Sequence, residues 1–282
     1  MTVNDVLTIL VPLAALCSVA AMWWRGWLGP GALRPPRDPR PIQPVDVMIG
    51  LALLVGGLTI GQLIVLQLWP TPTGQGGDAV SLSPRQQAWA GLMIQLAMAL
   101  PPIGWLIFRA SDAAGPSELG LMPRRIGRQI GVGLLALLMI TPLILTTHGA
   151  SQWIAKSVFE YEADPVAHVV LRAMLETQSP LTLGVFIGSA VVIAPVVEEL
   201  IYRGLIQSAI ASALGGANRW LTVFAAGVLF TAIHLASVGT VALPGLFVLS
   251  VALGWLYERT RSVWPGVVMH SLFNAGNIAW LF

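Results

Sequence analysis

Charged residues are scarce in this chain of 282 residues. Asp, Glu, Lys and Arg make up 10% of it, whereas soluble domains carry about 25%. Hydrophobic residues make up 56%, so the composition excludes an ordinary soluble domain and indicates a membrane protein. The formal net charge is +2, and the basic residues fall mainly between apolar runs. There they act as topology signals, and we expect no nucleic-acid partner.

Cysteine is almost absent as well. The single thiol, Cys17, cannot form an intrachain disulfide, so cysteine usage does not indicate a compartment. Residues 1–5, before the first apolar run, contain no Lys or Arg. A secretory signal peptide begins with a positively charged segment. We therefore expect the first apolar run to be a retained transmembrane helix.

Long apolar runs dominate the rest of the chain. A membrane-spanning helix needs about 20 mostly apolar residues, and eight segments qualify. They cover about residues 5–24, 45–69, 87–109, 129–149, 181–203, 219–237, 240–257 and 263–282. Residues 150–180 mix apolar and charged side chains, which is typical of an amphipathic helix on the membrane interface. The sequence therefore predicts an all-α polytopic membrane bundle with one interfacial segment and no soluble domain.

The basic residues also predict the orientation of the bundle. Twelve of the fifteen Lys and Arg residues lie in the first, third, fifth and seventh connections. The positive-inside rule then puts these connections in the cytosol and both termini outside. We expect an integral protein of the bacterial cytoplasmic membrane that contacts lipid directly.

Two adjacent glutamates, Glu198 and Glu199, lie in the middle of a long apolar stretch. A charge at the centre of a bilayer costs about 2.5–3.5 kcal/mol. Arg203 follows Glu199 by four residues and shares its helical face, so we expect these two to pair. Glu198 is rotated by about 100° and stays free. A buried Glu–Arg clamp between helices would explain Glu199 and Arg203 but not Glu198. Pro195, one turn earlier, can expose backbone beside the carboxylates.

Two histidines, His234 and His270, are embedded in later apolar segments, and Asn274 lies one turn after His270 on the same face. A chain turn at Gly215-Gly216 would bring Glu199 and His234 to nearly equal depth in an antiparallel hairpin. His270 follows a cytosolic connection by nine residues, about 13 Å at 1.5 Å per residue. We therefore expect one buried site nearer the cytosolic side.

These groups allow two kinds of chemistry. A carboxylate and an imidazole on one water molecule form a general base, while an imidazole and a carboxamide can donate hydrogen bonds to an oxyanion. Together they suit amide hydrolysis. Glu198, His234 and His270 could instead bind catalytic Zn²⁺. The spacing does not separate the two, and we favour water activation without a metal or other cofactor.

Three motifs, Glu198-Glu199-x-x-x-Arg203, Phe230-x-x-x-His234 and His270-x-x-x-Asn274, resemble those of the CPBP family in order and spacing. This family comprises the CAAX-prenyl-protease and bacteriocin-processing membrane proteins and is also called Abi. The resemblance covers about residues 180–280. It implies an intramembrane endopeptidase, a class often labelled metalloprotease, acting on peptide or protein substrates that are lipidated in eukaryotic members.

The resemblance also implies roles for individual residues. The positions of Glu198 and His234 would activate water, and those of His270 and Asn274 would form an oxyanion hole. Glu199, counted among the catalytic residues, would support Glu198 together with Arg203 and Phe230. Residues 129–282, with the motifs within 195–274, would form the protease core, and residues 1–128 would be accessory spans.

Two other functions remain open on the sequence alone. Intramembrane Glu and His also mark proton relays in transporters, although the chain shows no internal repeat and its acidic and imidazole groups gather in one half. A non-catalytic immunity or binding protein could keep the same fold. All motif residues are present, which favours the hydrolase.

Overall fold

A computed structural model describes residues 3–29, 31–33, 42–70, 82–113, 115–117, 119–162, 169–216 and 218–282. Within these ranges the chain is helical and contains no strand. The helices are α1 (Val3–Trp24), α2 (Pro44–Leu68), α3 (Pro84–Ala113), α4 (Ile126–Phe159), α5 (Val169–Glu176), α6 (Pro180–Gly188), η1 (Ser189–Ile193), α7 (Ala194–Glu199), η2 (Leu200–Gln207), α8 (Ser208–Ala213), α9 (Arg219–Ile233), η3 (His234–Ala236), η4 (Thr240–Ala242), α10 (Leu243–Thr260) and α11 (Trp264–Leu281).

The expected all-α polytopic membrane bundle is confirmed. Each of the eight predicted spans is helical, and six described helices are long and apolar enough to cross a membrane: 44–68, 84–112, 126–159, 180–213, 219–236 and 240–260. In α1 the apolar described part is shorter, Thr8–Trp24. The last span, α11, is not among the six, because its 18 residues include His270, Asn274 and Asn277.

One helical rod runs without interruption from Pro180 to Ala213, through α6, η1, α7, η2 and α8. The fifth span was expected to end near residue 203, so the rod is longer by about three turns. It ends where the chain reverses at Gly215 and Gly216, whose φ values of 57° and 71° favour glycine. The predicted turn at these two glycines is confirmed.

The expected interfacial segment, residues 150–180, is not one helix. Its first part continues α4 to Phe159, and the only other helix among its described residues before Pro180 is the short α5. Residues 163–168 lie outside the described residues. The fourth span was therefore placed correctly but drawn too short.

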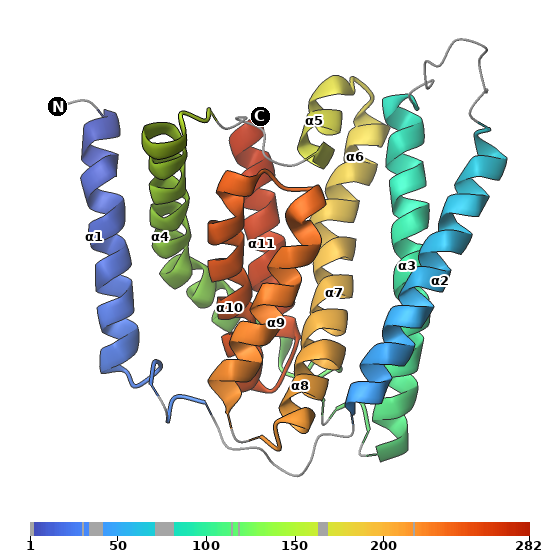
Figure 1. Cartoon of the computed structure of the whole chain (residues 1–282), viewed down its shortest axis with the longest axis horizontal. Coiled ribbons are helices and arrows are strands. Elements are labelled where there is room, and N and C mark those ends of the chain that lie inside the picture. Colours follow the sequence, from blue (N-terminus) through green and yellow to red (C-terminus); the bar gives the residue numbers. More distant parts are fainter. Residues whose placement is uncertain are drawn as a thin grey trace.

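The long rod lies in the middle of the bundle (Figure 1). Its segments pack on α3 on one side and on α9, α10 and α11 on the other, and α2 packs mainly on α3. At the opposite edge, α1 lies against α4, which in turn packs on α10 and α11. The start of α1 and the end of α11 lie at the same end of the bundle (Figure 1), as an even number of crossings requires.

Candidate active site

The rod departs from α-helical geometry on both sides of the two glutamates. The π-helical turns η1 and η2 flank the short helix α7, which carries Glu198 and Glu199 at its end. A π-helical turn hydrogen-bonds residue i to i+5 and is frequent at functional sites. In η1 the N–H of Ala194 donates to the carbonyl of Ser189. Pro195 follows directly and has no N–H to donate, so one backbone carbonyl of this turn lacks a helical donor.

Glu199 is completely buried and paired. Arg203 Nε donates to its Oε2 at 3.1 Å, and both side chains are 0% exposed. Arg203 Nη2 also donates to Ser250 Oγ on α10 at 3.1 Å, and the guanidinium lies 5.6 Å from the centre of the Phe230 ring. The expected Glu199–Arg203 pair is therefore present, and it ties the rod to α9 and α10.

Glu198 faces the two histidines. Its Oε2 lies 4.0 Å from His234 Nε2 and 3.8 Å from His270 Nε2, and the side chain is 25% exposed. This oxygen is buried and accepts no hydrogen bond from a described residue. The equal depth expected for the glutamates and His234 is confirmed by these distances. Three helices thus bring three polar groups to one point.

His234 has a defined tautomer. It follows α9 directly, and its Nδ1 lies 2.7 Å from the carbonyl of Phe230, one turn earlier. A carbonyl oxygen only accepts hydrogen bonds, so Nδ1 must carry a proton. In the neutral ring Nε2 is then an acceptor, and this is the nitrogen that faces Glu198. Packing of the two rings, with centroids 4.6 Å apart, fixes the orientation of the imidazole.

His270 lies between the two glutamates. Its Nδ1 is 3.4 Å from Glu199 Oε1, while its Nε2 points to Glu198, and the side chain is 5% exposed. The carboxylate of Glu199 favours a proton on Nδ1, which leaves Nε2 for the site. The sequence indicated Arg203 as the partner of Glu199. The structure adds His270 as a second one.

Asn274 contacts backbone rather than another motif side chain. It lies one turn above His270 on α11, and its Nδ2 donates to the carbonyl of Ala190 in η1 at 2.9 Å. A carboxamide nitrogen carries two protons. One is used by Ala190, and the second remains able to donate.

A second buried polar cluster follows on the same rod and was not expected from the sequence. Gln207 Nε2 donates to the Gly254 carbonyl and to Glu258 Oε1, each at 3.0 Å, and Glu258 also pairs with Arg219. Gln207 and Glu258 are 0% exposed, and Arg219 is buried. The sequence counts Arg219 among the basic residues of the fifth connection, and Glu258 directly follows the expected seventh span. Neither position indicated burial, which results from the packing of α9 on α10 that brings the two opposite charges together.

Two glycines allow the buried charges to approach neighbouring backbone. A Cβ atom on Gly266 would lie 2.9 Å from Glu199 Oε2, and one on Gly254 would lie 2.9 Å from Gln207 Oε1 and 3.6 Å from Arg203 Nη1. Sequence reasoning missed both positions, since a glycine in an apolar helix gives no signal of what packs against it.

The three candidate zinc ligands are too far apart for that ion. Bonds of about 2.0–2.2 Å in a tetrahedral site put ligand atoms about 3.4 Å from each other, whereas Glu198 Oε2 lies 4.0 and 3.8 Å from the two Nε2 atoms. Among the described residues, no group of three or more His, Cys, Asp or Glu is arranged to hold a metal ion. The residues as they lie do not fit zinc, and the reaction proposed below contains no step through it.

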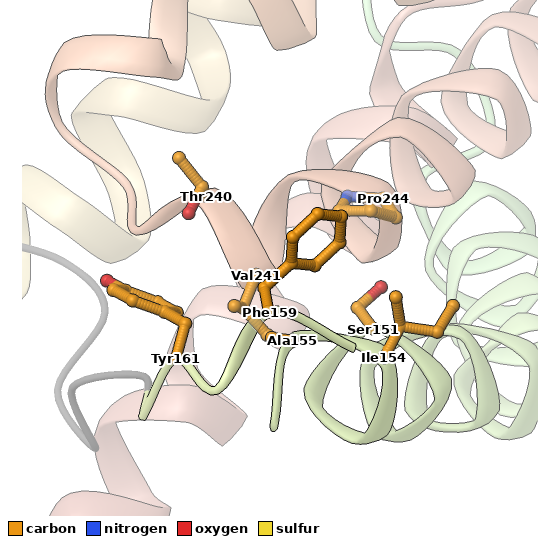
Figure 2. A pocket seen from close by; sticks show the side chains of 8 residues that line it. All are labelled: Ser151, Ile154, Ala155, Phe159, Tyr161, Thr240, Val241 and Pro244. Carbon is orange, nitrogen blue, oxygen red and sulfur yellow. The ribbon is translucent and has the colours of Figure 1, made fainter. Parts of the chain in front are cut away.

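A separate cavity of about 600 Å³ lies at the C-terminal end of α4 (Figure 2). It is bounded by α4, by η4 and by the start of α10, and none of the seven predicted site residues lines it. The lining residues are Ser151, Ile154, Ala155, Phe159, Tyr161, Thr240, Val241 and Pro244.

Comparison with known proteins agrees with the geometry. Residues 180–276 match the family model of the type II CAAX prenyl endopeptidases, Rce1-like. This match contains all three motifs and confirms the resemblance seen in the sequence. The family that this model describes consists of prenyl endopeptidases, and the six membrane-capable helices indicate an integral membrane protein.

One curated relative is the UPF0177 protein YaiF of Lactococcus lactis subsp. lactis (strain IL1403), which is 26% identical over 141 residues. The matched region is 49% of this chain and 61% of the relative, so the similarity spans less than two thirds of that protein. No solved structure matches the chain.

Proposed function

We propose that this chain is an intramembrane endopeptidase in which Glu198 and His234 activate a water molecule. The observation that carries the proposal is the position of Glu198 Oε2, which is buried, accepts no hydrogen bond from a described residue, and faces His234 Nε2 and His270 Nε2 at 4.0 and 3.8 Å. A buried carboxylate oxygen without a hydrogen bond is available to accept one from the water molecule that reacts.

The separations favour one water molecule between the groups. Direct hydrogen bonds have lengths of about 2.7–3.2 Å, so 3.8–4.0 Å is too long for them. One water at about 2.8 Å from each of two such atoms spans this separation with an angle of about 90° between its contacts. If the water donates one hydrogen bond to Glu198 and one to His234 Nε2, its lone pair remains available to attack the carbonyl carbon of a substrate.

The proposed hydrolysis proceeds in two steps. The water oxygen attacks the carbonyl carbon of the scissile bond, and its proton passes to Glu198, which acts as general base. The C–N bond of the tetrahedral intermediate then breaks, and the proton moves from Glu198 to the leaving nitrogen. General acid–base catalysis of this kind contributes about 10²–10⁴-fold. His234 holds the water through Nε2 while its Nδ1 proton is fixed on the Phe230 carbonyl.

The oxyanion would be stabilised from α11. The second Nδ2 proton of Asn274 and a proton on His270 Nε2 are the two donors. Because Nδ1 of His270 faces the Glu199 carboxylate at 3.4 Å, Nε2 is the ring nitrogen that faces the reacting groups and would donate this hydrogen bond when it carries a proton. Loss of one oxyanion donor reduces kcat by about 10²–10³-fold in enzymes that use such donors.

The family match and the surroundings of the site support a substrate class. The relatives described by the matching family model are prenyl endopeptidases, and the site is buried among membrane-capable helices. We propose a peptide or protein substrate that reaches the site from the lipid, including lipidated ones, in a membrane where the Arg219 end of the rod faces the cytosol.

A reconstituted cleavage assay tests the reaction. The purified chain in liposomes is given a fluorescence-quenched peptide with a farnesylated cysteine followed by three residues, the same peptide without the lipid, and a mixed peptide library read by mass spectrometry. Glu198→Gln and His234→Ala should each lower kcat by at least about 10²-fold. Glu176→Gln, at an exposed glutamate of α5, is the matched control and should cleave like the parent. Folded Glu198→Gln or His234→Ala that cleaves at the parent's rate would refute the assignment.

The same preparation tests the zinc alternative. Zinc content is measured on active protein before and after treatment with a chelator. Full activity at a zinc-to-protein ratio near zero is the expected result. Activity that disappears with the metal and returns with added Zn²⁺ would overturn the mechanism with water alone.

A further inference from the structure

The carbonyl of Ala190, which accepts the hydrogen bond from Asn274, has no hydrogen bond from either of its possible helical donors. The α-helical donor to Ala190 would be the N–H of Ala194, which instead bonds to Ser189. The π-helical donor would be residue 195, which is a buried proline without an N–H. Asn274 Nδ2 occupies the position of that missing donor at 2.9 Å. This contact is partly buried, and a backbone carbonyl left unpaired away from water is unfavourable. The proline removes the helical donor and the asparagine replaces it from another helix.

The η1 turn is also hydrogen-bonded to α3. Ser189 Oγ donates to Gln95 Oε1 on α3 at 2.5 Å. Residues 189 and 190 are thus bonded to α3 and α11, respectively, which fixes the direction in which the Ala190 carbonyl points. A carboxamide is planar, so a hydrogen bond from one Nδ2 proton to a fixed acceptor also sets the direction of the second proton.

We propose that Pro195 is a positioning residue for Asn274. By withholding a backbone N–H from η1, it leaves the Ala190 carbonyl to the Asn274 carboxamide and so aims the remaining Nδ2 proton at the reacting carbonyl. The catalytic effect of Pro195 rests on the proposed function. The anchoring of Asn274 on the Ala190 carbonyl rests on the hydrogen-bond pattern alone. Pro195 itself touches no reacting atom.

The decisive variant is Pro195→Ala, which returns an N–H to the turn. That N–H competes with Asn274 for the Ala190 carbonyl, while the helix gains a hydrogen bond and loses a ring clash, so the variant is expected to fold. Pro142→Ala is the matched control, because Pro142 also lies inside a membrane-capable helix, α4, but carries none of the contacts of the site.

Kinetics provide the first readout. Pro195→Ala should lower kcat about tenfold with KM unchanged, because only a transition-state contact is weakened. In an Asn274→Ala background the same substitution should change kcat less than twofold, since residues acting through one contact are not additive. Equal losses in both backgrounds, or a kcat equal to that of Pro142→Ala, would overturn the proposal.

A second readout does not depend on activity. The chain has four asparagines, at 4, 218, 274 and 277, so selective ¹⁵N-asparagine labelling gives four side-chain NH₂ signals, and Asn274→Ala assigns the one of interest. This signal should shift in Pro195→Ala and not in Pro142→Ala. If it does while the parent cleaves no peptide, the anchoring stands and the proposed function fails. An unchanged signal in Pro195→Ala refutes the anchoring.

Discussion

Replacing Gly266 with alanine should disturb the site without removing any of its polar groups. Gly266 lies in the first turn of α11, and a Cβ atom there would be 2.9 Å from Glu199 Oε2 and 3.5 Å from its Cδ. An ordinary contact needs at least 3.4 Å, so the carboxylate must retreat by about 0.5 Å. It has little room to do so, because its side chain is completely buried.

The displacement is large enough to break the contacts of Glu199. The hydrogen bond from Arg203 Nε to Oε2 is 3.1 Å long, and a retreat away from it by about 0.5 Å takes it out of hydrogen-bonding range. Overpacking in a core costs about 1–3 kcal/mol. Because Glu199 also faces His270, the same shift moves the proposed oxyanion donor, and a misplacement of about 1 Å can reduce the rate about 10²-fold. We therefore expect kcat/KM to fall by about 10–100-fold.

The assay compares Gly266→Ala with Gly276→Ala on the same helix. A Cβ atom on Gly276 meets nothing within 4 Å, and alanine is favoured over glycine in a helix by up to about 1 kcal/mol. The control should therefore match the parent in cleavage and be at least as stable in urea or thermal unfolding in mild detergent. Equal activity and stability in the two variants would show that Glu199 does not depend on the approach of α11.

The two buried charge clusters should respond differently to substitution. Arg203→Met leaves Glu199 buried without its cation, and it should lower the free energy of unfolding by about 3–5 kcal/mol and abolish peptide cleavage in the liposome assay; a stable and active variant would contradict the pairing. For the cluster of Arg219 and Glu258, Arg219→Met and Glu258→Leu should each destabilise more than the double variant, because each single change removes one member of a buried ion pair, while kcat stays within about twofold of the parent. A double variant that unfolds as easily as the worse single one would refute that account.

The sequence carried enough information for the geometry around Glu198. A spacing of four residues puts Glu199 and Arg203 on one helical face in any continuous helix, and the two glycines at 215 and 216 fix where the hairpin turns. Depth could then be counted along two helices, which is how His234 was placed opposite the glutamates. These predictions depend only on helical periodicity and rise, so they hold although the rod extends about three turns beyond the expected end of the span.

What the sequence did not provide depends on how the helices are rotated about their own axes. The contact of His270 with both glutamates requires a particular rotation of α11, and the Asn274–Ala190 bond requires a π-helical turn. Pro195 suggested free backbone acceptors beside the carboxylates, but the sequence did not predict the π-helical turn. Similarly, Glu258 and Arg219 looked like ordinary residues at span ends, because the pairing between α9 and α10 that buries them is tertiary. The division into accessory residues 1–128 and a core of 129–282 stays a prediction.

The N-terminal part nevertheless has defined contacts with the matched region. Trp255 Nε1 donates to the carbonyl of Trp27 and Trp220 Nε1 to that of Gly29, each at 2.9 Å, while Arg259 donates to the carbonyl of Ala32 at 2.8 Å. Three side chains from α9 and α10 thus hold the connection that follows α1. Since Trp255 and Arg259 share α10 with Ser250 and Glu258, the helix that secures the buried charges also secures this connection.

The proposed roles of the adjacent glutamates differ because their surroundings differ. Glu199 is 0% exposed and bonded to a guanidinium that α10 holds in place, so its carboxylate is fixed and its charge is balanced. Glu198, one residue earlier and rotated by about 100°, is 25% exposed and faces two imidazole nitrogens at 3.8–4.0 Å. A proton acceptor in catalysis must be able to change its charge, and a balanced ion pair resists that change. In the proposed reaction the same rod therefore supplies a fixed carboxylate, Glu199, for orientation and a second one, Glu198, for proton transfer, and the arginine four residues after Glu199 distinguishes the two.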